Sequence, residues 1–234
     1  MFFFLLVGCR SFLPENNLKN SIKPIQDGFQ YESLIQVQDG HRSAFVVFPE
    51  PRSPQGIVLF DAGASDSEDN PILEIIAEKN YDVADVSHIF LTHEHQSHIK
   101  GISLFPNAEI FALSEAMNQI TQQGGYVDTS LSSGEIIQVG SHSIEAFLVP
   151  GHSDGSSSFL INSTLIMGDS AISYMDETIG TMDEDEISQQ SLLSLGSSFA
   201  ERVSDVDIIL FSHSGPLYDI NALIDYQPVF VGLN

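Results

Sequence analysis

The sequence predicts a layered α/β fold with polar side chains gathered at one edge of its sheets. Two patterns predict it: short apolar runs alternate with amphipathic stretches, and several of the apolar runs end in loops that carry His or Asp. The composition agrees, because 42% hydrophobic and 9% aromatic residues in a 234-residue chain can fill a large core. Disorder is therefore excluded as the main state of the chain.

The first half of the chain has the pattern of strands followed by a helix. Segments rich in β-branched and aromatic residues, separated by Asp-Gly or Pro-containing turns, predict strands over 31–37, 43–48 and 56–60. Apolar residues then recur at spacings of three and four over 71–77, which predicts a helix there.

The second half repeats a strand, loop and helix pattern. Two amphipathic stretches predict helices over 113–122 and 186–203, and the acidic run 183–186 is interpreted as the cap of the second one. A calcium loop is the weaker reading of that run, because the alternating ligand spacing is absent. Short apolar runs predict further strands over 88–91, 146–149, 164–167 and 207–211.

The N-terminus opens with an apolar run that is shorter than the about 20 residues a helix needs to span a bilayer. Leu6-Val7-Gly8-Cys9 resembles the lipobox of bacterial lipoproteins, in which the cysteine is lipidated. A buried strand is the alternative, because no Lys or Arg precedes the run. We expect a lipoprotein-like signal and tether over 1–29, in which 10–27 is a tether or an extended lead-in, and one domain over 30–234. The expected location is the bacterial cell envelope, with the cytoplasm as the alternative.

The charge balance limits the partners. The chain has 32 Asp and Glu against 8 Lys and Arg, a formal net charge of −24. Such a surface repels phosphate backbones, so we expect a small-molecule substrate and no nucleic acid. We expect contact with a membrane only through a lipid anchor at Cys9. Because Cys9 is the single cysteine, intramolecular disulfides and cysteine-rich zinc clusters are excluded.

The strongest chemical signal is a cluster of histidines after the predicted strand 88–91. His93 and His95 can point the same way as the chain leaves the strand, and His98 returns to that side if a helical turn begins at His95. Three imidazoles that leave one position open are typical of catalytic zinc. Three more strand-end loops present single residues of the same kind: His152, Asp169 and His213. Together these side chains predict a metal centre.

These motifs, in this order, resemble those of the metallo-β-lactamase-fold hydrolases. The family pattern is an early Asp-x-Gly, then H-x-H-x-D-H, a Pro-Gly-His, a Gly-Asp and a final His. The resemblance runs from about residue 60 to 216, with Asp61-Ala62-Gly63 as its first element. It implies a four-layer αββα sandwich with the metals at the edge between the sheets.

The resemblance also implies a ligand set. His93, His95 and His152 would bind a first zinc ion, while His98 and His213 would bind a second, with Asp169 bridging the two. Asp61 would orient a ligand loop, or it would simply shape the turn before Gly63.

Ser97 departs from the family pattern, which has an aspartate ligand of the second metal at this place. A neutral hydroxyl cannot replace a carboxylate, so we expect a firmly filled first zinc site and a weakened or vacant second one. Glu94 and Asp154 are nearby carboxylates that could substitute, but both are expected to face solvent.

The expected activity is hydrolysis of a small ester, lactone, amide or phosphodiester by metal-bound hydroxide, because zinc lowers the pKa of its bound water to about 7. Asp169 would orient the nucleophile or take its proton, and His98 and His213, if free of metal, would stabilise the developing oxyanion. The alternative is a degenerate, non-catalytic metal-binding envelope protein with the same fold, for which Ser97 is the only positive support.

Overall fold

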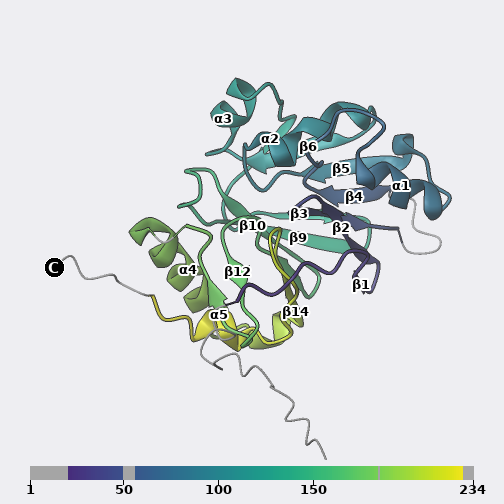
Figure 1. Cartoon of the computed structure of the whole chain (residues 1–234). Coiled ribbons are helices and arrows are strands. Elements are labelled where there is room, and N and C mark those ends of the chain that lie inside the picture. Colours follow the sequence, from purple (N-terminus) through teal and green to yellow (C-terminus); the bar gives the residue numbers. More distant parts are fainter. Residues whose placement is uncertain (1–20, 50–55, 184, 229–234) are drawn as a thin grey trace, which may run out of the picture.

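Two β-sheets lie face to face in the computed structural model, and helices cover the outer face of each (Figure 1). The structure describes residues 21–49, 56–183 and 185–228. In Figure 1 the helices α1, α2 and α3 lie on one side of the paired sheets, and α4 and α5 lie on the other. The four-layer sandwich that the resemblance implies is therefore confirmed.

The first sheet contains seven strands that follow one another in sequence order. The strands β4, β5, β6 and β7 pair in parallel, so the loops that leave β4 and β5 emerge at the same edge. Its strands are β1 (Gln30–Tyr31), β2 (Leu34–Asp39), β3 (Arg42–Val47), β4 (Ile57–Phe60), β5 (Val86–Phe90), β6 (Glu109–Leu113) and β7 (Thr129–Leu131).

The second sheet has the order β14-β11-β10-β9-β8. Because β11 and β14 are parallel neighbours, the loops that follow them also leave at one edge. Its strands are β8 (Ile136–Val139), β9 (His142–Leu148), β10 (Ser157–Ile161), β11 (Thr164–Ile166) and β14 (Ile208–Leu210), and a separate hairpin pairs β12 (Ile172–Ser173) with β13 (Ile179–Gly180).

The helices connect the strands and cover the sheets. The first sheet is covered by α1 (Pro71–Glu78), α2 (Gln96–Ile99) and α3 (Met117–Gln122), and the second by α4 (Glu186–Phe199) and α5 (Asn221–Ile224). Short 3-10 helices, Val83–Asp85, Lys100–Leu104 and Val203–Asp205, complete the connections.

Alternating side chains of the strands divide the interior into three apolar clusters. In β4, Ile57 and Leu59 pack toward the helices, while Val58 and Phe60 pack between the sheets. The cluster between the sheets has an aromatic centre, in which the rings of Phe60, Phe90 and Phe159 lie 5.5 to 5.6 Å from one another. These contacts hold the two sheets together and fix how their loop-bearing edges meet.

Four predicted elements differ from the structure by three or more residues at one end, and one of them is the strand predicted over 146–149, which already begins at His142. The predicted strand 31–37 is broken by a turn at Glu32, whose φ of 51° takes the chain out of the extended conformation. The predicted helix 113–122 begins only at Met117, because Leu113 is the last residue of β6. The predicted helix 186–203 ends at Phe199.

The segment before residue 30 is partly described. Residues 1–20, with the proposed lipidation site Cys9, lie outside the described residues. Residues 21–29 lie against the domain: Lys23 N donates to Ser173 O at 2.9 Å, and Gly215 N donates to Lys23 O at 2.9 Å. This part of the expected tether is therefore an extended lead-in to the fold. None of the helices in the described ranges is long and apolar enough to cross a membrane.

Removal of a ring from the cluster between the sheets should loosen the whole sandwich. Phe159 is fully buried and contacts both Phe60 and Phe90. We expect Phe159→Ala to lower the free energy of unfolding by about 3–5 kcal/mol, as measured by urea denaturation.

A matched control is Ile136→Thr in β8 of the same sheet, where the side chain is 53% exposed and the β-branched shape is kept. It should change the free energy of unfolding by less than about 0.5 kcal/mol. Equal losses in the two variants would contradict the assignment of the ring cluster as the main contact between the sheets.

Candidate metal centre

The structure brings all six predicted metal-site residues together at one edge of the sandwich. They come from the loops that follow β5, β9, β11 and β14, and Asp61 follows β4. His93, His98 and Asp169 are buried, His152 and His213 are half-buried, and His95 is exposed. The site therefore has a buried floor and one side open to solvent.

Three ring nitrogens of the first predicted site converge. His95 Nδ1 lies 3.0 Å from His93 Nε2 and 3.0 Å from His152 Nε2. The same three residues form a cluster able to hold a metal ion. The sequence-based grouping of these histidines therefore corresponds to one group in space.

Asp61 holds two of the histidines from behind. Its buried carboxylate accepts from His98 Nδ1 at 2.7 Å, from Thr92 N at 2.8 Å and from Thr92 Oγ1 at 2.9 Å. Since the Thr92 hydroxyl donates to Asp61, it accepts from His93 Nδ1, which lies 3.0 Å away. The network thus keeps a proton on Nδ1 of both histidines and turns each Nε2 toward the centre.

The backbone around Asp61 is built for this role. Asp61 has a φ of 62°, in the left-handed region that few non-glycine residues occupy. Gly168, in the loop before Asp169, also has a positive φ, and a Cβ atom on it would lie 2.8 Å from the Thr92 side chain. Of the two readings of Asp61 from the sequence, the orienting contact is the one present in the structure.

Asp183 holds His152 in a similar way. Its carboxylate accepts from His152 Nδ1 at 2.7 Å, so the lone pair of His152 Nε2 faces His95. The acidic run that was interpreted as a helix cap is therefore divided: Asp185 caps α4 by accepting from Ser188 N at 2.9 Å, while Asp183 supports the candidate site.

Asp169 lies between the two predicted sites. Its Oδ2 atom lies 3.1 Å from His213 Nε2 and 3.4 Å from His152 Nε2, and its Oδ1 atom lies 3.4 Å from His98 Nε2. A bridging position of Asp169 between the two groups agrees with this geometry.

The protonation states follow from burial and from these carboxylates. Burial, with a smaller effect of neighbouring histidines, lowers the pKa of His93. The exposed His95 is covered on one side only, and this partial covering, with a smaller effect of His152, lowers its pKa in the same direction, so both are neutral at pH 7. Burial also opposes a charge on His98, but Asp61 and Asp169 outweigh it and raise the pKa of His98 to about 10. Burial opposes ionisation of Asp169 as well, yet the hydrogen bond from His213 and the nearby charge of His98 hold its pKa below the usual range.

The donor set fits a zinc ion at the first group. With the protons of His93 and His152 on Nδ1, His95 Nδ1 faces two lone pairs at 3.0 Å and can donate to only one of them. A cation satisfies all three nitrogens, and ligands 2.0–2.1 Å from a tetrahedral zinc ion lie about 3.3 Å apart. Neutral imidazoles are also the protonation state that metals bind.

The second group, His98, His213 and Asp169, also has buried polar atoms that a metal ion could pair. His98 Nε2 and Asp169 Oδ1 are both buried without a hydrogen-bond partner among the described residues. A metal ion there would pair both atoms and would release the proton that the carboxylates hold on His98.

Glu94 and Asp154 are the two nearby carboxylates that could replace the one missing at Ser97. Ser97 is half-buried in α2. Glu94, expected to face solvent, is only 9% exposed and accepts from Ser153 Oγ at 2.8 Å, so that expectation was wrong. Asp154 is exposed, as expected. Among the described residues, the two groups of side chains close enough to hold a metal ion include neither Glu94 nor Asp154.

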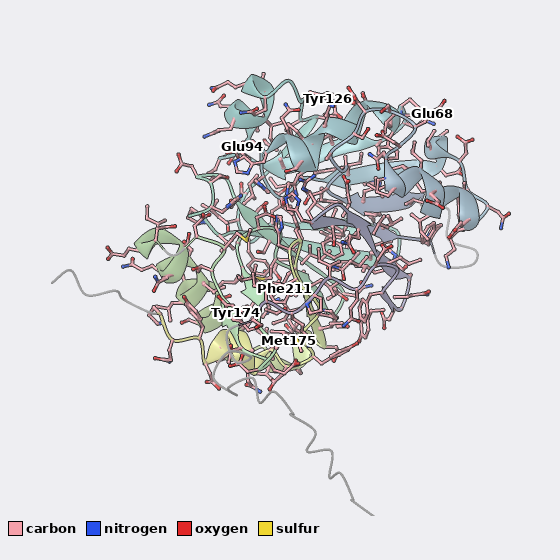
Figure 2. All side chains as sticks on the ribbon, viewed as in Figure 1. Glu68, Glu94, Tyr126, Tyr174, Met175 and Phe211 are labelled. Atoms are coloured by element: carbon pink, nitrogen blue, oxygen red, sulfur yellow. The ribbon has the colours of Figure 1, made fainter. Side chains whose placement is uncertain are left out.

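Three contributors were missed from the sequence: Thr92, Asp183 and His41. Thr92 precedes His93 directly, but nothing in the sequence pattern pairs it with Asp61. His41 is not among the predicted site residues, yet its ring lies 5.4 Å from the ring of His213. Figure 2 shows Glu94 well apart from Tyr174 and Met175, which lie near each other.

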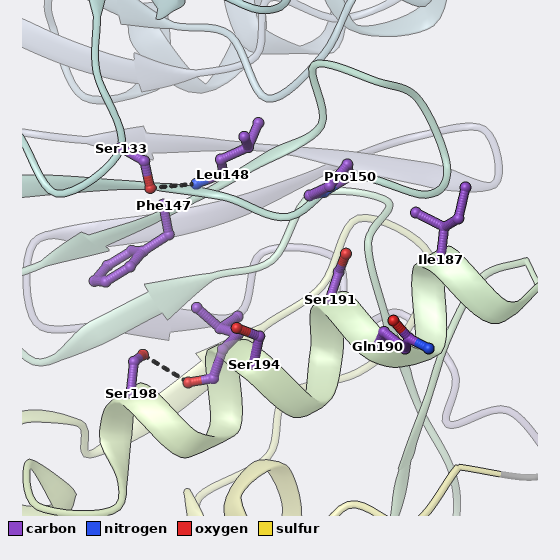
Figure 3. A pocket seen from close by; sticks show the side chains of 10 residues that line it. Ser133, Phe147, Leu148, Pro150, Ile187, Gln190, Ser191, Ser194 and Ser198 are labelled. Carbon is purple, nitrogen blue, oxygen red and sulfur yellow. Dashed lines mark hydrogen bonds between the residues drawn. The ribbon is translucent and has the colours of Figure 1, made fainter.

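An uncharged groove of about 420 Å³ lies between α4 and the end of β9 (Figure 3). Its wall combines serines of one helix face with apolar side chains, among them Phe147 and Pro150. Pro150, in the wall of this groove, begins the loop that carries His152.

Comparison with known proteins gives a family. A family model described as the metallo-beta-lactamase superfamily matches residues 38–213, more than half of the chain. The chain is 29% identical over 108 residues to "Metallo-beta-lactamase domain-containing protein 1" of Xenopus laevis, which covers 46% of this chain and 44% of that protein. It is 27% identical over 120 residues to a hydroxyacylglutathione hydrolase of Buchnera aphidicola subsp. Schizaphis graminum (strain Sg). The aligned region covers 50% of this chain and 43% of that protein. Both matches span less than half the length of these relatives.

Solved structures share the fold. A metallo-β-lactamase with a HARLDQ motif from Cronobacter sakazakii aligns with a TM-score of 0.59 at 21% identity, covering 82% of this chain and 79% of that one. At 21% identity this similarity shows a shared fold and no more.

Loss of the carboxylate behind His152 should weaken zinc binding. We expect Asp183→Ala to reduce zinc affinity by about 10- to 100-fold, because His152 loses the partner that fixes its tautomer. Competition with a chelating indicator dye measures the affinity. Asp154→Ala, which removes an exposed carboxylate two residues from His152, is the control for charge. Equal losses in the two variants would show that Asp183 acts only through its charge.

Proposed function

Because the chain belongs to the metallo-β-lactamase superfamily, we propose that it is a zinc-dependent hydrolase of a small ester, lactone, amide or phosphodiester. The observation that carries the proposal is the convergence of the ring nitrogens of His93, His95 and His152 at an open edge of the sheets. Zinc, when bound, lowers the pKa of a water molecule to about 7 and so supplies a nucleophile at neutral pH.

The protein residues prepare the site for this chemistry. Asp61, through Thr92, and Asp183 hold the Nδ1 protons of His93 and His152, so that the opposite nitrogens are free to bind metal. Because those partners fix the rings in advance, little reorganisation is needed when the ion binds. The exposed His95 leaves the remaining side of the group accessible to substrate.

Asp169 is proposed to orient the attacking water. Its lowered pKa keeps the carboxylate ionised, which suits it to accept a hydrogen bond more than to store a proton. Where the second group is free of metal, His98 and His213 flank Asp169 and would donate hydrogen bonds to the oxyanion that develops on the substrate.

The second zinc is proposed to bind more weakly than the first. Ser97 supplies no carboxylate at the family's ligand position, which leaves His98, His213 and a share of Asp169. The first group, in contrast, has all three of its histidines in place.

A non-catalytic metal-binding protein is the second candidate, and Ser97 is the observation that favours it. Such a protein would bind zinc at the first group and turn over none of the substrate classes. Turnover of probes by the zinc-loaded protein therefore distinguishes the two candidates.

The location of the protein is a separate proposal from its sequence. The lipobox-like Leu6-Val7-Gly8-Cys9 supports lipidation at Cys9 and a place in the bacterial cell envelope. The net charge of −24 supports a small-molecule substrate over a nucleic acid.

Removal of a first-group histidine should abolish hydrolysis. We expect zinc-loaded protein to turn over at least one generic ester, lactone or phosphodiester probe, and His93→Ala to lower kcat/KM by more than about 100-fold, beyond the loss typical of an outer partner. The control is His88→Gln, because His88 is a half-buried histidine that stacks on Phe111; this variant should keep the activity. Zinc binding with no turnover of any probe by the unaltered protein would support the non-catalytic candidate.

Restoring the carboxylate should fill the second group. We expect Ser97→Asp to raise the zinc content from about one to about two ions per chain after exhaustive dialysis, because an anionic ligand joins His98 and His213. Elemental analysis measures the ratio, and Ser97→Asn, of similar size but neutral, should stay near one. Two tightly held ions per chain in the unaltered protein would sink the explanation based on Ser97.

A further inference from the structure

The hairpin that joins β2 to β3 lies at the border of the metal centre. Its two turn residues are Gly40 and His41, and Gly40 has a φ of 67°, as the first central residue of a type II′ turn requires. The turn places His41 and Arg42 at the tip of the hairpin.

Two contacts fix this hairpin to the loops of the site. Asp39 Oδ2 accepts from Ala64 N at 2.8 Å, which ties the tip to the loop that begins with Asp61. Gln36, which is fully buried, donates from Nε2 to Ser43 Oγ at 2.9 Å and to Phe211 O at 3.4 Å, beside the loop that carries His213. The tip is therefore held in place relative to both halves of the candidate site.

His41 contacts His213 of the site, and Arg42 contacts His41 in turn. The exposed ring of His41 lies against His213, with 5.4 Å between ring centroids and 32° between planes. Arg42 Nη2 lies 3.3 Å from His41 Nε2, and since a guanidinium only donates, His41 Nε2 accepts. His41 thus links the guanidinium to the rim of the metal centre.

The charge of Arg42 stands out in a chain with few cations. The described residues include five Lys and Arg, and three of these form ion pairs: Lys23 with Glu177, Lys100 with Asp66, and Arg202 with Glu145 and Asp205. No ion pair within the described ranges includes Arg42 or Lys79. Of these two, Lys79 follows α1, while Arg42 lies beside the site. The carboxylate nearest to it along the hairpin, that of Asp39, is engaged by the Ala64 amide.

We propose that Arg42, oriented by His41, binds an oxyanion of the substrate, so that the preferred substrates carry a carboxylate or phosphate group away from the bond that is cleaved. The proposal rests on the proposed hydrolytic site, whose metal would bind the other end of the substrate. An arginine fork offers five donors and pairs with such groups through two parallel hydrogen bonds, and the contact to His41 leaves most of those donors free. A single fixed cation at the rim also selects anionic small molecules although the whole surface is negative.

Ligand binding tests the proposal without requiring turnover. Zinc-loaded protein is titrated by calorimetry with succinate, with 3-phosphonopropionate and with succinamate, in which one carboxylate is replaced by a neutral amide. We expect at least one of the two dianionic ligands to bind about 10- to 100-fold more tightly than succinamate. We expect Arg42→Gln to remove most of that preference, while Lys79→Gln, which removes the same charge elsewhere, keeps it.

The outcomes separate this proposal from the hydrolytic one. A preference for succinate identifies a carboxylate and a stronger preference for the phosphonate identifies a phosphate group, and loss of either in Arg42→Gln supports the proposal. The absence of any preference in the unaltered protein, or its persistence in Arg42→Gln, overturns it. An Arg42-dependent preference in a protein that hydrolyses no probe would instead count against the hydrolytic function alone.

Discussion

The carboxylate of Asp61 is the constraint on which the arrangement of the metal centre depends. It is 1% exposed, it follows β4 in a left-handed conformation, and it accepts hydrogen bonds from Thr92 and His98 in the loop after β5. Through the Thr92 hydroxyl it also fixes the tautomer of His93, so one carboxylate turns two imidazoles toward the centre. Asp183 does the same for His152 from the start of α4, on the other side of the sandwich. The ligand nitrogens are thus oriented by residues that would not touch the metal themselves.

Much of this could be predicted from the sequence, because both the fold and the ligands have local patterns. The strands that carry the ligands are short apolar runs, and parallel neighbours such as β4 with β5 and β11 with β14 must deliver their loops to one edge. The partners behind the ligands have no such pattern: Asp183 lies 31 residues from His152, and the close approach of Ser188 in α4 to Gly151 accompanies their contact. The helix expected over 113–122 began too early because Leu113 extends an apolar run that belongs to a strand, and short apolar runs do not distinguish the two.

Two asymmetries of the site bear on its chemistry. The first histidine group is complete, whereas the second lacks a carboxylate at Ser97, so the two groups are expected to differ in affinity even though Asp169 touches both. The charges near the site are also uneven: the groove lined by Pro150 and α4 is uncharged, while Arg42 lies next to His41, whose ring contacts His213. The −24 net charge opposes polyanionic partners, and the proposed role of Arg42 would attract a small anionic substrate locally.

We propose that the Asp61 and Asp183 networks present three specific nitrogens to one zinc ion. Diffraction from crystals of the zinc-loaded protein, recorded at the zinc absorption edge, tests it most directly. We expect one strong anomalous peak bonded to His93 Nε2, His95 Nδ1 and His152 Nε2, at about 2.0–2.1 Å from each. A zinc ion bound through His93 Nδ1 or His152 Nδ1, or a strongest zinc peak away from these three histidines, would contradict it.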